Sequence, residues 1–182
     1  AMLDRYIERQ TISQGAIEFL SKSFIDIKPK RAEASRVTRI ALQGITGINE
    51  RIRIKATIIP SNTFCANSVN YIDFTNCSYN YKYILALLNS RLLNFIFKKF
   101  STNSNVNGYE VDRLPIYNIQ NHEQIESCVN EIFTLTNSED YFANNMKQSK
   151  VQEISSKIDN IIYQLYGLTD GEIKIIEESL KN

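Results

Sequence analysis

Apolar residues recur at alternating spacings of three and four within residues 83–100. The stripe consists of Leu85, Leu88, Leu92 and Phe95. This spacing is typical of one face of an α-helix. Further apolar residues widen the stripe beyond a narrow seam, as they do in helices that other elements cover on most sides. We therefore predict one central core helix over 83–100.

Upstream of this helix the sequence alternates between apolar and polar positions, which is typical of half-buried strands. In residues 51–59 the alternation predicts that Arg51, Arg53 and Lys55 share one face of a sheet. Several short strands joined by turn residues indicate a mixed, mostly antiparallel sheet. The predicted extended segments are 24–27, 38–43, 51–59, 63–66, 68–74 and 109–115.

Helical periodicity returns downstream of residue 120, with expected helices over 123–136 and 150–167. Thr169 and Glu172 have the spacing of a capping box and predict the start of a last helix. The predicted fold class is α+β, with the sheet around the central apolar helix and a C-terminal helical segment after it. We expect a body over 1–120 and a helical appendage over 121–182. The appendage is expected to pack on the body or on a catalytic domain that this chain lacks.

Composition narrows the range of functions. The 182 residues are 43% hydrophobic, which suffices for a buried core, but no apolar run reaches the roughly 20 residues of a membrane span. The three cysteines are scattered without metal-binding or redox spacing, which fits a cytoplasmic protein. The single histidine, His122, lies at an expected helix start. We therefore predict no metal site, no membrane contact and a cytoplasmic location.

Charge is distributed unevenly along the chain. Residues 1–118 carry 16 basic and 9 acidic groups, whereas residues 119–182 carry 5 and 11. A basic portion joined to an acidic one indicates a surface that faces a polyanion and another that faces solvent or protein. The polar loop after the core helix, residues 101–108, is rich in asparagine. A rigid helix that presents a polar loop is a common arrangement for a binding site.

Five short sequences occur in an order that resembles a known family. They are Arg-Ile-Ala-Leu-Gln-Gly-Ile (39–45), Ala-Thr-Ile-Ile-Pro (56–60), Asn-Ser-Val (67–69), Leu-Leu-Asn-Ser-Arg-Leu (87–92) and Leu-Pro (114–115). This order resembles TaqI-like target recognition domains, the C-terminal specificity domains of type IIG restriction-modification enzymes and related adenine-specific DNA methyltransferases. The resemblance is best over 36–119, and 165–177 is similar to the closing helical segment of many such chains.

The resemblance implies a domain that recognises specific sequences in double-stranded DNA. It also implies a parent chain that contains a catalytic methyltransferase domain and uses S-adenosylmethionine, with or without an endonuclease activity. Such catalysis requires a glycine-rich cofactor turn and an Asn/Asp/Ser-Pro-Pro-aromatic loop beside the flipped base. Neither occurs here, and the nearest string, at 76–79, lacks both prolines. We therefore predict no catalytic residues and no cofactor in this chain.

Candidate DNA contacts follow from side-chain chemistry. Arginine, glutamine and asparagine can make paired hydrogen bonds to base edges, whereas lysine presents a point charge suited to phosphate. The competing hypothesis is a protein-interaction module that docks a partner subunit through its helices, with little dependence on salt. The candidate DNA-binding residues are Lys28, Lys30, Arg31, Arg39, Gln43, Arg51, Arg53, Lys55, Lys98, Lys99, Asn103, Asn105 and Asn107.

Overall fold

The computed structural model describes residues 5–6, 33–65, 68–75, 77–119 and 121–181. The predicted strand 24–27 and the candidate residues Lys28, Lys30 and Arg31 lie outside this described part. Within it the fold is α+β, as predicted.

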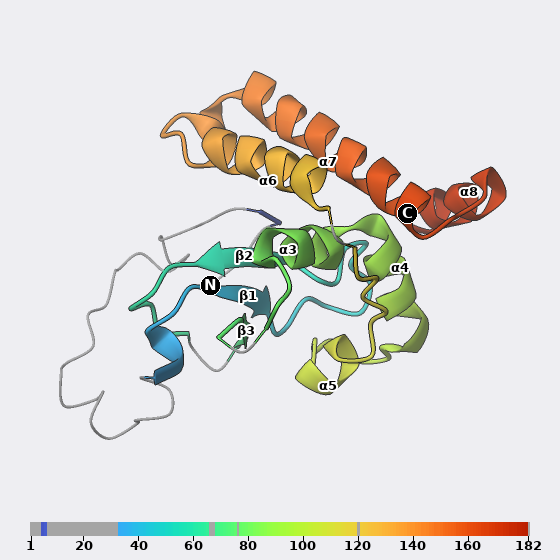
Figure 1. Ribbon diagram of the computed structural model, residues 1–182. Coiled ribbons are helices and arrows are strands. Elements are labelled where there is room, and N and C mark those ends of the chain that lie inside the picture. Colours follow the sequence, from blue (N-terminus) through green and yellow to red (C-terminus); the bar gives the residue numbers. More distant parts are fainter. Residues whose placement is uncertain (1–4, 7–32, 66–67, 76, 120, 182) are drawn as a thin grey trace.

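Three strands form the sheet of the described residues (Figure 1). They are β1 (Arg39–Gln43), β2 (Ala56–Ile59) and β3 (Val69–Asp73), in the order β2-β1-β3. Both neighbours run antiparallel to the central β1. Ile40 and Leu42 point from β1 into the main hydrophobic core. Alternation in the sequence therefore identified the central strand correctly.

The expected strand over 51–59 is regular only from Ala56 onward, and its three cations do not share one face. Arg53 is fully buried, Arg51 is exposed, and Lys55 pairs with Glu50 at 3.5 Å. The physical reason is that β1 binds this segment only at its end, where the Gln43 N–H donates to the Lys55 carbonyl at 3.0 Å, whereas a side chain binds the backbone before it. The amide N–H groups of Arg53 and Ile54 both donate to the Asn94 side-chain oxygen, at 2.8 and 2.7 Å.

The predicted core helix is divided into two helices, α3 (Tyr81–Asn89) and α4 (Arg91–Phe100). Ser90 between them is extended, with ψ 153°. Its hydroxyl donates to the Leu87 carbonyl at 2.7 Å and accepts from the Leu93 N–H at 3.2 Å. One serine thus ends the first helix and caps the second, while the apolar spacing continues across the break.

The asparagine before this break binds the edge of the sheet. The Asn89 side chain accepts from the Ala56 N–H and donates to the Ala56 carbonyl, both at 3.0 Å. An amide side chain can therefore pair with an edge strand as a neighbouring backbone would, which satisfies buried groups that would otherwise be unpaired. This contact holds α3 against β2.

Two other expected extended segments also differ. Residues 109–115 begin with the short helix α5 (Gly108–Val111), which a capping box between Asn107 and Glu110 stabilises. Thr63–Cys65, the described part of the expected strand 63–66, is not a regular strand. In residues 109–115, the side-chain bonds of the capping box determined a helical start in place of the expected extended conformation.

The helical segment contains α6 (Glu123–Thr136), the 3₁₀ turn η1 (Tyr141–Ala143), α7 (Asn145–Leu165) and α8 (Asp170–Ser179). Thr169 caps α8 through the predicted capping box with Glu172. Figure 1 shows α6 and α7 as an antiparallel pair beside α3. Core residues of the body and of these helices form one hydrophobic cluster. The boundary at residue 120 stays a prediction.

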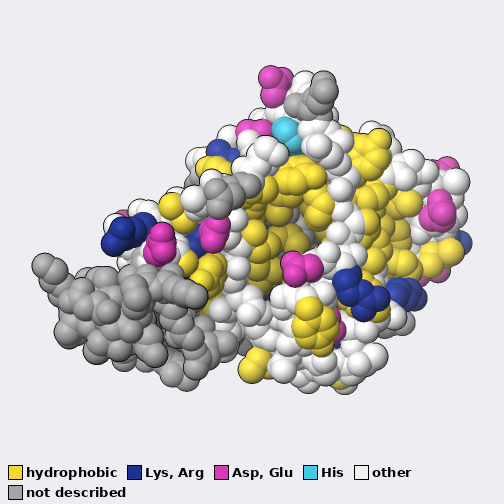
Figure 2. Space-filling model, turned by 60° about the horizontal axis from the view of Figure 1, so that its bottom comes forward, with side chains coloured by type: hydrophobic (Ala, Val, Ile, Leu, Met, Phe, Trp, Pro, Cys, Tyr) yellow, Lys and Arg dark blue, Asp and Glu magenta, His cyan; other side chains and the backbone are white. Residues whose placement is uncertain are grey.

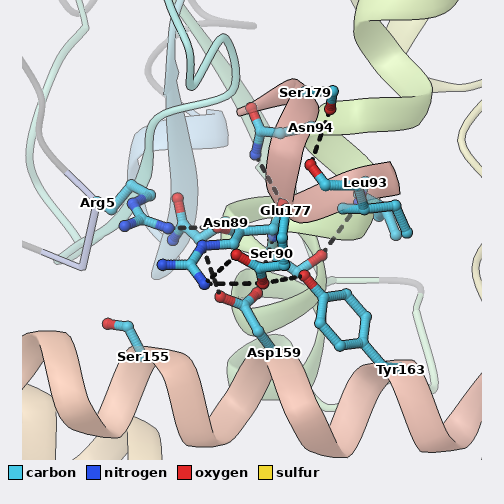
Figure 3. Close-up of polar contacts among 12 residues, drawn as sticks. Arg5, Asn89, Ser90, Leu93, Asn94, Ser155, Asp159, Tyr163, Glu177 and Ser179 are labelled. Carbon is cyan, nitrogen blue, oxygen red and sulfur yellow. Dashed lines mark hydrogen bonds and ion pairs between the residues drawn. The ribbon is translucent and has the colours of Figure 1, made fainter. Parts of the chain in front are cut away.

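A partly buried polar network joins α4 to α7 and α8 (Figure 3). Asp159 accepts from the Arg91 backbone N–H at 2.8 Å, and the Arg91 guanidinium binds Glu177 at 2.8 Å. Tyr163 donates to the same Glu177 at 2.8 Å. Burial raises the pKa of Asp159 to about 6, although hydrogen bonding and charge from Arg91 oppose the shift.

This raised pKa predicts how stability depends on pH. Between about pH 4 and 6 the folded protein holds the Asp159 proton that the unfolded chain has already released, so stability falls as pH rises. Above pH 6 the loss amounts to about 2–3 kcal/mol relative to pH below 4. Asp159→Asn has no carboxyl group that titrates at this position. Between pH 4 and 7 its free energy of unfolding should therefore rise by about 2–3 kcal/mol relative to that of wild type. Urea unfolding of both proteins at four pH values measures it, and parallel curves would refute the prediction.

Candidate nucleic-acid interface

Two loops lie side by side beyond the sheet, and we call residues 44–50 and 101–107 the paired loops. An isolated antiparallel bridge joins Ile45 to Asn105. Two backbone hydrogen bonds flank the bridge at 3.0 and 2.8 Å, and they run from Thr46 N–H to the Ser104 carbonyl and from Val106 N–H to the Gly44 carbonyl. The loops therefore form one hydrogen-bonded surface.

Arg53 lies beneath the paired loops and binds both of them. Its Nε donates to the Thr46 hydroxyl at 3.0 Å, and its Nη2 donates to the carbonyls of Asn103 and Asn105 at 2.7 and 3.2 Å. The guanidinium carbon lies 5.5 Å from the centre of the Phe97 ring. One buried cation thus fixes the spacing of the two loops, because a guanidinium offers several donors in a rigid plane.

Neighbouring side chains hold the ends of the loops. Gln43 donates to the Ile45 carbonyl at 2.7 Å, and Asn70 donates to the Val106 carbonyl at 2.5 Å. A Cβ atom on Gly44 would lie 2.7 Å from the Ser68 carbonyl oxygen, so the close approach of the two backbones requires glycine at this position. The paired loops are therefore fixed at several points before any ligand binds.

The outward side of the paired loops is polar with two apolar side chains. Thr102, Asn103, Ser104 and Asn105 are exposed. Ile45 and Ile48 are 56% and 47% exposed. Amides and hydroxyls can form hydrogen bonds with base edges, and exposed apolar groups can contact the thymine methyl group.

The candidate residues divide into exposed and internal ones. Arg39 is buried, donates to the Val37 and Thr63 carbonyls, and lies over the Tyr71 ring. Arg53 is also internal. The structure thus directs these two arginines toward protein carbonyls, where they position the strand and the loops.

Gln43 and Asn107 hold the paired loops from their ends. Asn107 donates from its side chain to Glu110 at 2.9 Å within the α5 capping box. The candidates that lie outward on the paired loops are therefore Asn103 and Asn105.

Lys98 and Lys99 occupy the last turn of α4, directly before the second paired loop. The ammonium group of Lys99 lies 4.5 Å from the centre of the Phe95 ring. Arg51 lines a cavity of about 520 Å³ with Arg5, Arg91 and residues of α7. The structure therefore brings two lysines next to the second paired loop. Arg51 directly follows the first paired loop, but its guanidinium points away toward the C-terminal helices and donates to the Lys181 carbonyl at 3.5 Å.

One face of the molecule is shown in Figure 2. Apolar side chains gather there in a hollow, and lysine and arginine side chains lie at its edges rather than in a continuous band. Among the described residues, the lysines and arginines therefore do not form a uniform cationic surface on this face. Positive charge is local, so recognition here would depend on individual contacts.

The sequence predicted only a turn at residues 44–47 and did not predict that residues 44–50 pair with the loop 101–107. The available signal was the presence of two isoleucines, Ile45 and Ile48, close to Gly47 in a segment expected to turn. In the described ranges no group of three histidine, cysteine, aspartate or glutamate residues could hold a metal ion. In that same part of the chain no helix is both long and apolar enough to span a membrane.

Comparison with known proteins gives a family match and similar solved structures. The family model for the TaqI-like C-terminal specificity domain matches residues 7–116. Among solved structures, the chain is similar to the type IIL restriction-modification enzyme MmeI, whose structure was determined in complex with DNA. That match has a TM-score of 0.57 and 16% sequence identity, and it covers 80% of this chain and 21% of the MmeI chain. No curated protein matches the sequence.

Proposed function

The chain belongs to the TaqI-like C-terminal specificity domains, and we infer from this that it recognises DNA for a restriction-modification enzyme. The observation that carries the proposal is the pair of loops that buried Arg53 binds together. A surface fixed before binding loses little conformational entropy when it meets a ligand. Rigid placement of Asn103 and Asn105 therefore suits the discrimination of base edges.

The proposal assigns separate roles to different side chains. Outward amides and hydroxyls of the paired loops read bases in the major groove. Lys98 and Lys99 contact phosphates, which position the protein but carry no sequence information. Arg53, Gln43 and Asn107 position the loops and do not themselves contact DNA.

The matched part covers 21% of the MmeI chain, so catalysis is proposed to belong to other parts of a longer parent. We propose that the parent is an adenine-specific DNA methyltransferase in the cytoplasm that binds S-adenosylmethionine in a separate catalytic domain. The present chain should bind no S-adenosylmethionine, because both motifs that hold the cofactor and the target base are missing from its sequence. Calorimetric titration checks this, and a measurable binding heat with 1:1 stoichiometry would contradict it.

Phosphate contacts give the test of DNA recognition. Lys98→Gln and Lys99→Gln in the parent should weaken binding to target and random duplexes alike and should reduce the salt slope by about one per lost contact. Lys174→Gln on the exposed side of α8 is the matched control. It should leave the salt slope unchanged for target and for random duplexes. If the control and test variants had equal slopes, the lysines would not contact DNA.

A second candidate function is docking of a partner subunit through the helices. Phe142 and Met146, near the η1 turn between α6 and α7, are 55% and 83% exposed. Large apolar side chains close together on an acidic segment are compatible with a protein interface. This function predicts association that varies little with salt, whereas DNA binding weakens steeply as salt rises.

A further inference from the structure

Ile45 and Asn105 lie directly opposite each other in the bridge between the paired loops. In an antiparallel pair such residues project to the same side, with Cβ atoms about 4.5–5.5 Å apart. Both residues are exposed. The outward surface therefore presents an apolar side chain beside a carboxamide.

The three asparagines of the second paired loop differ in what remains free for a ligand. The Asn103 side-chain oxygen accepts the Asn105 backbone N–H at 2.8 Å, and the Asn107 amide binds Glu110. Asn105 is held only through its backbone, since its carbonyl accepts from Arg53 at 3.2 Å. Its side-chain oxygen and amide group can thus both be offered to one base.

The chemistry of this pair matches one kind of base pair. In the major groove, adenine presents the N7 acceptor and the N6 donor, and its partner thymine presents a methyl group. A carboxamide is complementary to the adenine edge, and an isoleucine side chain is complementary to the methyl group. The other base pair types in the major groove have no methyl group, because only thymine carries one.

We propose that Ile45 and Asn105 together read a single A·T pair in the target, an inference that rests on the proposed DNA-recognition function. Asn105 accepts a hydrogen bond from adenine N6 and donates one to adenine N7. Ile45 packs on the methyl group of the thymine in the same pair. Arg53 maintains the spacing because it binds the carbonyls of the second loop and the hydroxyl of Thr46 in the first.

Two atomic changes in the DNA test the proposal in the parent enzyme. Deoxyuridine in place of one thymine removes only the methyl group, and 7-deazaadenine in place of one adenine removes only the N7 acceptor. At one A·T pair, deoxyuridine should weaken wild-type binding about fourfold. At the same pair, 7-deazaadenine should weaken it about tenfold.

The variants should lose these sensitivities selectively. Deoxyuridine should not change DNA binding by Ile45→Ala, whereas 7-deazaadenine should still weaken it. Asn105→Ala should show the reverse. Ile175→Ala, an exposed isoleucine on α8, should behave as wild type. Thermal unfolding checks that each variant is folded, and Ile45→Val provides a milder change if the alanine variant is not.

Several results would overturn the inference. Wild-type indifference to deoxyuridine at every thymine would exclude the methyl contact, and equal sensitivity of Ile45→Ala and wild type would assign that contact to another residue. Sensitivities at two different base pairs would refute the single-pair arrangement. If the wild-type parent preferred no DNA sequence at all, the proposed function itself would fail, which is a separate and recognisable outcome.

Discussion

Replacing Asn94 with alanine is expected to lower the free energy of unfolding by about 4–5 kcal/mol. The Asn94 side chain is fully buried and makes four hydrogen bonds. Its oxygen accepts from the backbone N–H groups of Arg53 and Ile54, and its amide donates to the carbonyls of Leu88 and Ser90 at 3.2 and 2.9 Å. Alanine would remove all four bonds, and of these groups the Ser90 carbonyl would keep the backbone N–H of residue 94 at 3.1 Å.

Urea unfolding measures this effect directly. Asn130→Ala is the matched control, because Asn130 is exposed on α6, and it should change stability by no more than about 0.5 kcal/mol. Asn94→Asp retains the acceptor but opposes two carbonyls with a carboxylate, so it should also be strongly destabilising. A loss below about 1 kcal/mol for Asn94→Ala would mean that water or rearrangement replaces these bonds.

Replacing Arg53 with methionine is expected to reduce discrimination between target and single-base variants in the parent at least about tenfold. Methionine fills much of the same space but cannot donate to Thr46, Asn103 or Asn105. The free energy of unfolding should fall by about 2–4 kcal/mol, because partly buried carbonyls and the buried Thr46 hydroxyl lose their charged donor. The loops then lose their fixed spacing while the exposed asparagines stay in place.

Arg51→Met is the control for this change, because Arg51 lies two positions away and is exposed. It should leave discrimination unchanged and alter stability only slightly. Competition binding with target and variant duplexes gives the discrimination ratio, and urea unfolding gives the stability. Full discrimination by a folded Arg53→Met protein would show that Arg53 does not position Asn103 and Asn105 for base recognition.

Elements with long periodic patterns could be predicted from the sequence. The alternation of Ile40 and Leu42 identified β1, and the helical spacing identified α6 and α7. The break at Ser90 could not be predicted from hydrophobicity, because the apolar spacing is uninterrupted there. The Ser90 hydroxyl makes the break through bonds to Leu87 and Leu93. Beside it, Asn94 binds the distant Arg53 and Ile54. A hydrophobicity pattern contains neither kind of bond.

The candidate site was predictable in part for the same reason. Composition identified residues 101–108 as a polar loop, and Asn103 and Asn105 are exposed there. Alternation predicted that Arg53 shares one sheet face with Arg51 and Lys55. Its guanidinium instead donates to the carbonyl of Asn103, which lies fifty positions away in the sequence. The bridge between Ile45 and Asn105 is likewise a tertiary contact, so the sequence predicted only a turn at 44–47 in place of the first loop.

The central claim is that the paired loops read the DNA sequence, and selection from a random duplex library tests it most directly. The wild-type parent should enrich one sequence, and Asn103→Ala/Asn105→Ala should still bind DNA but lose preference at one or more of its positions. A Lys174→Ala/Glu178→Ala control on α8 should enrich the wild-type sequence. If the double asparagine variant enriched the same sequence as strongly as wild type, the paired loops would not be the reading surface.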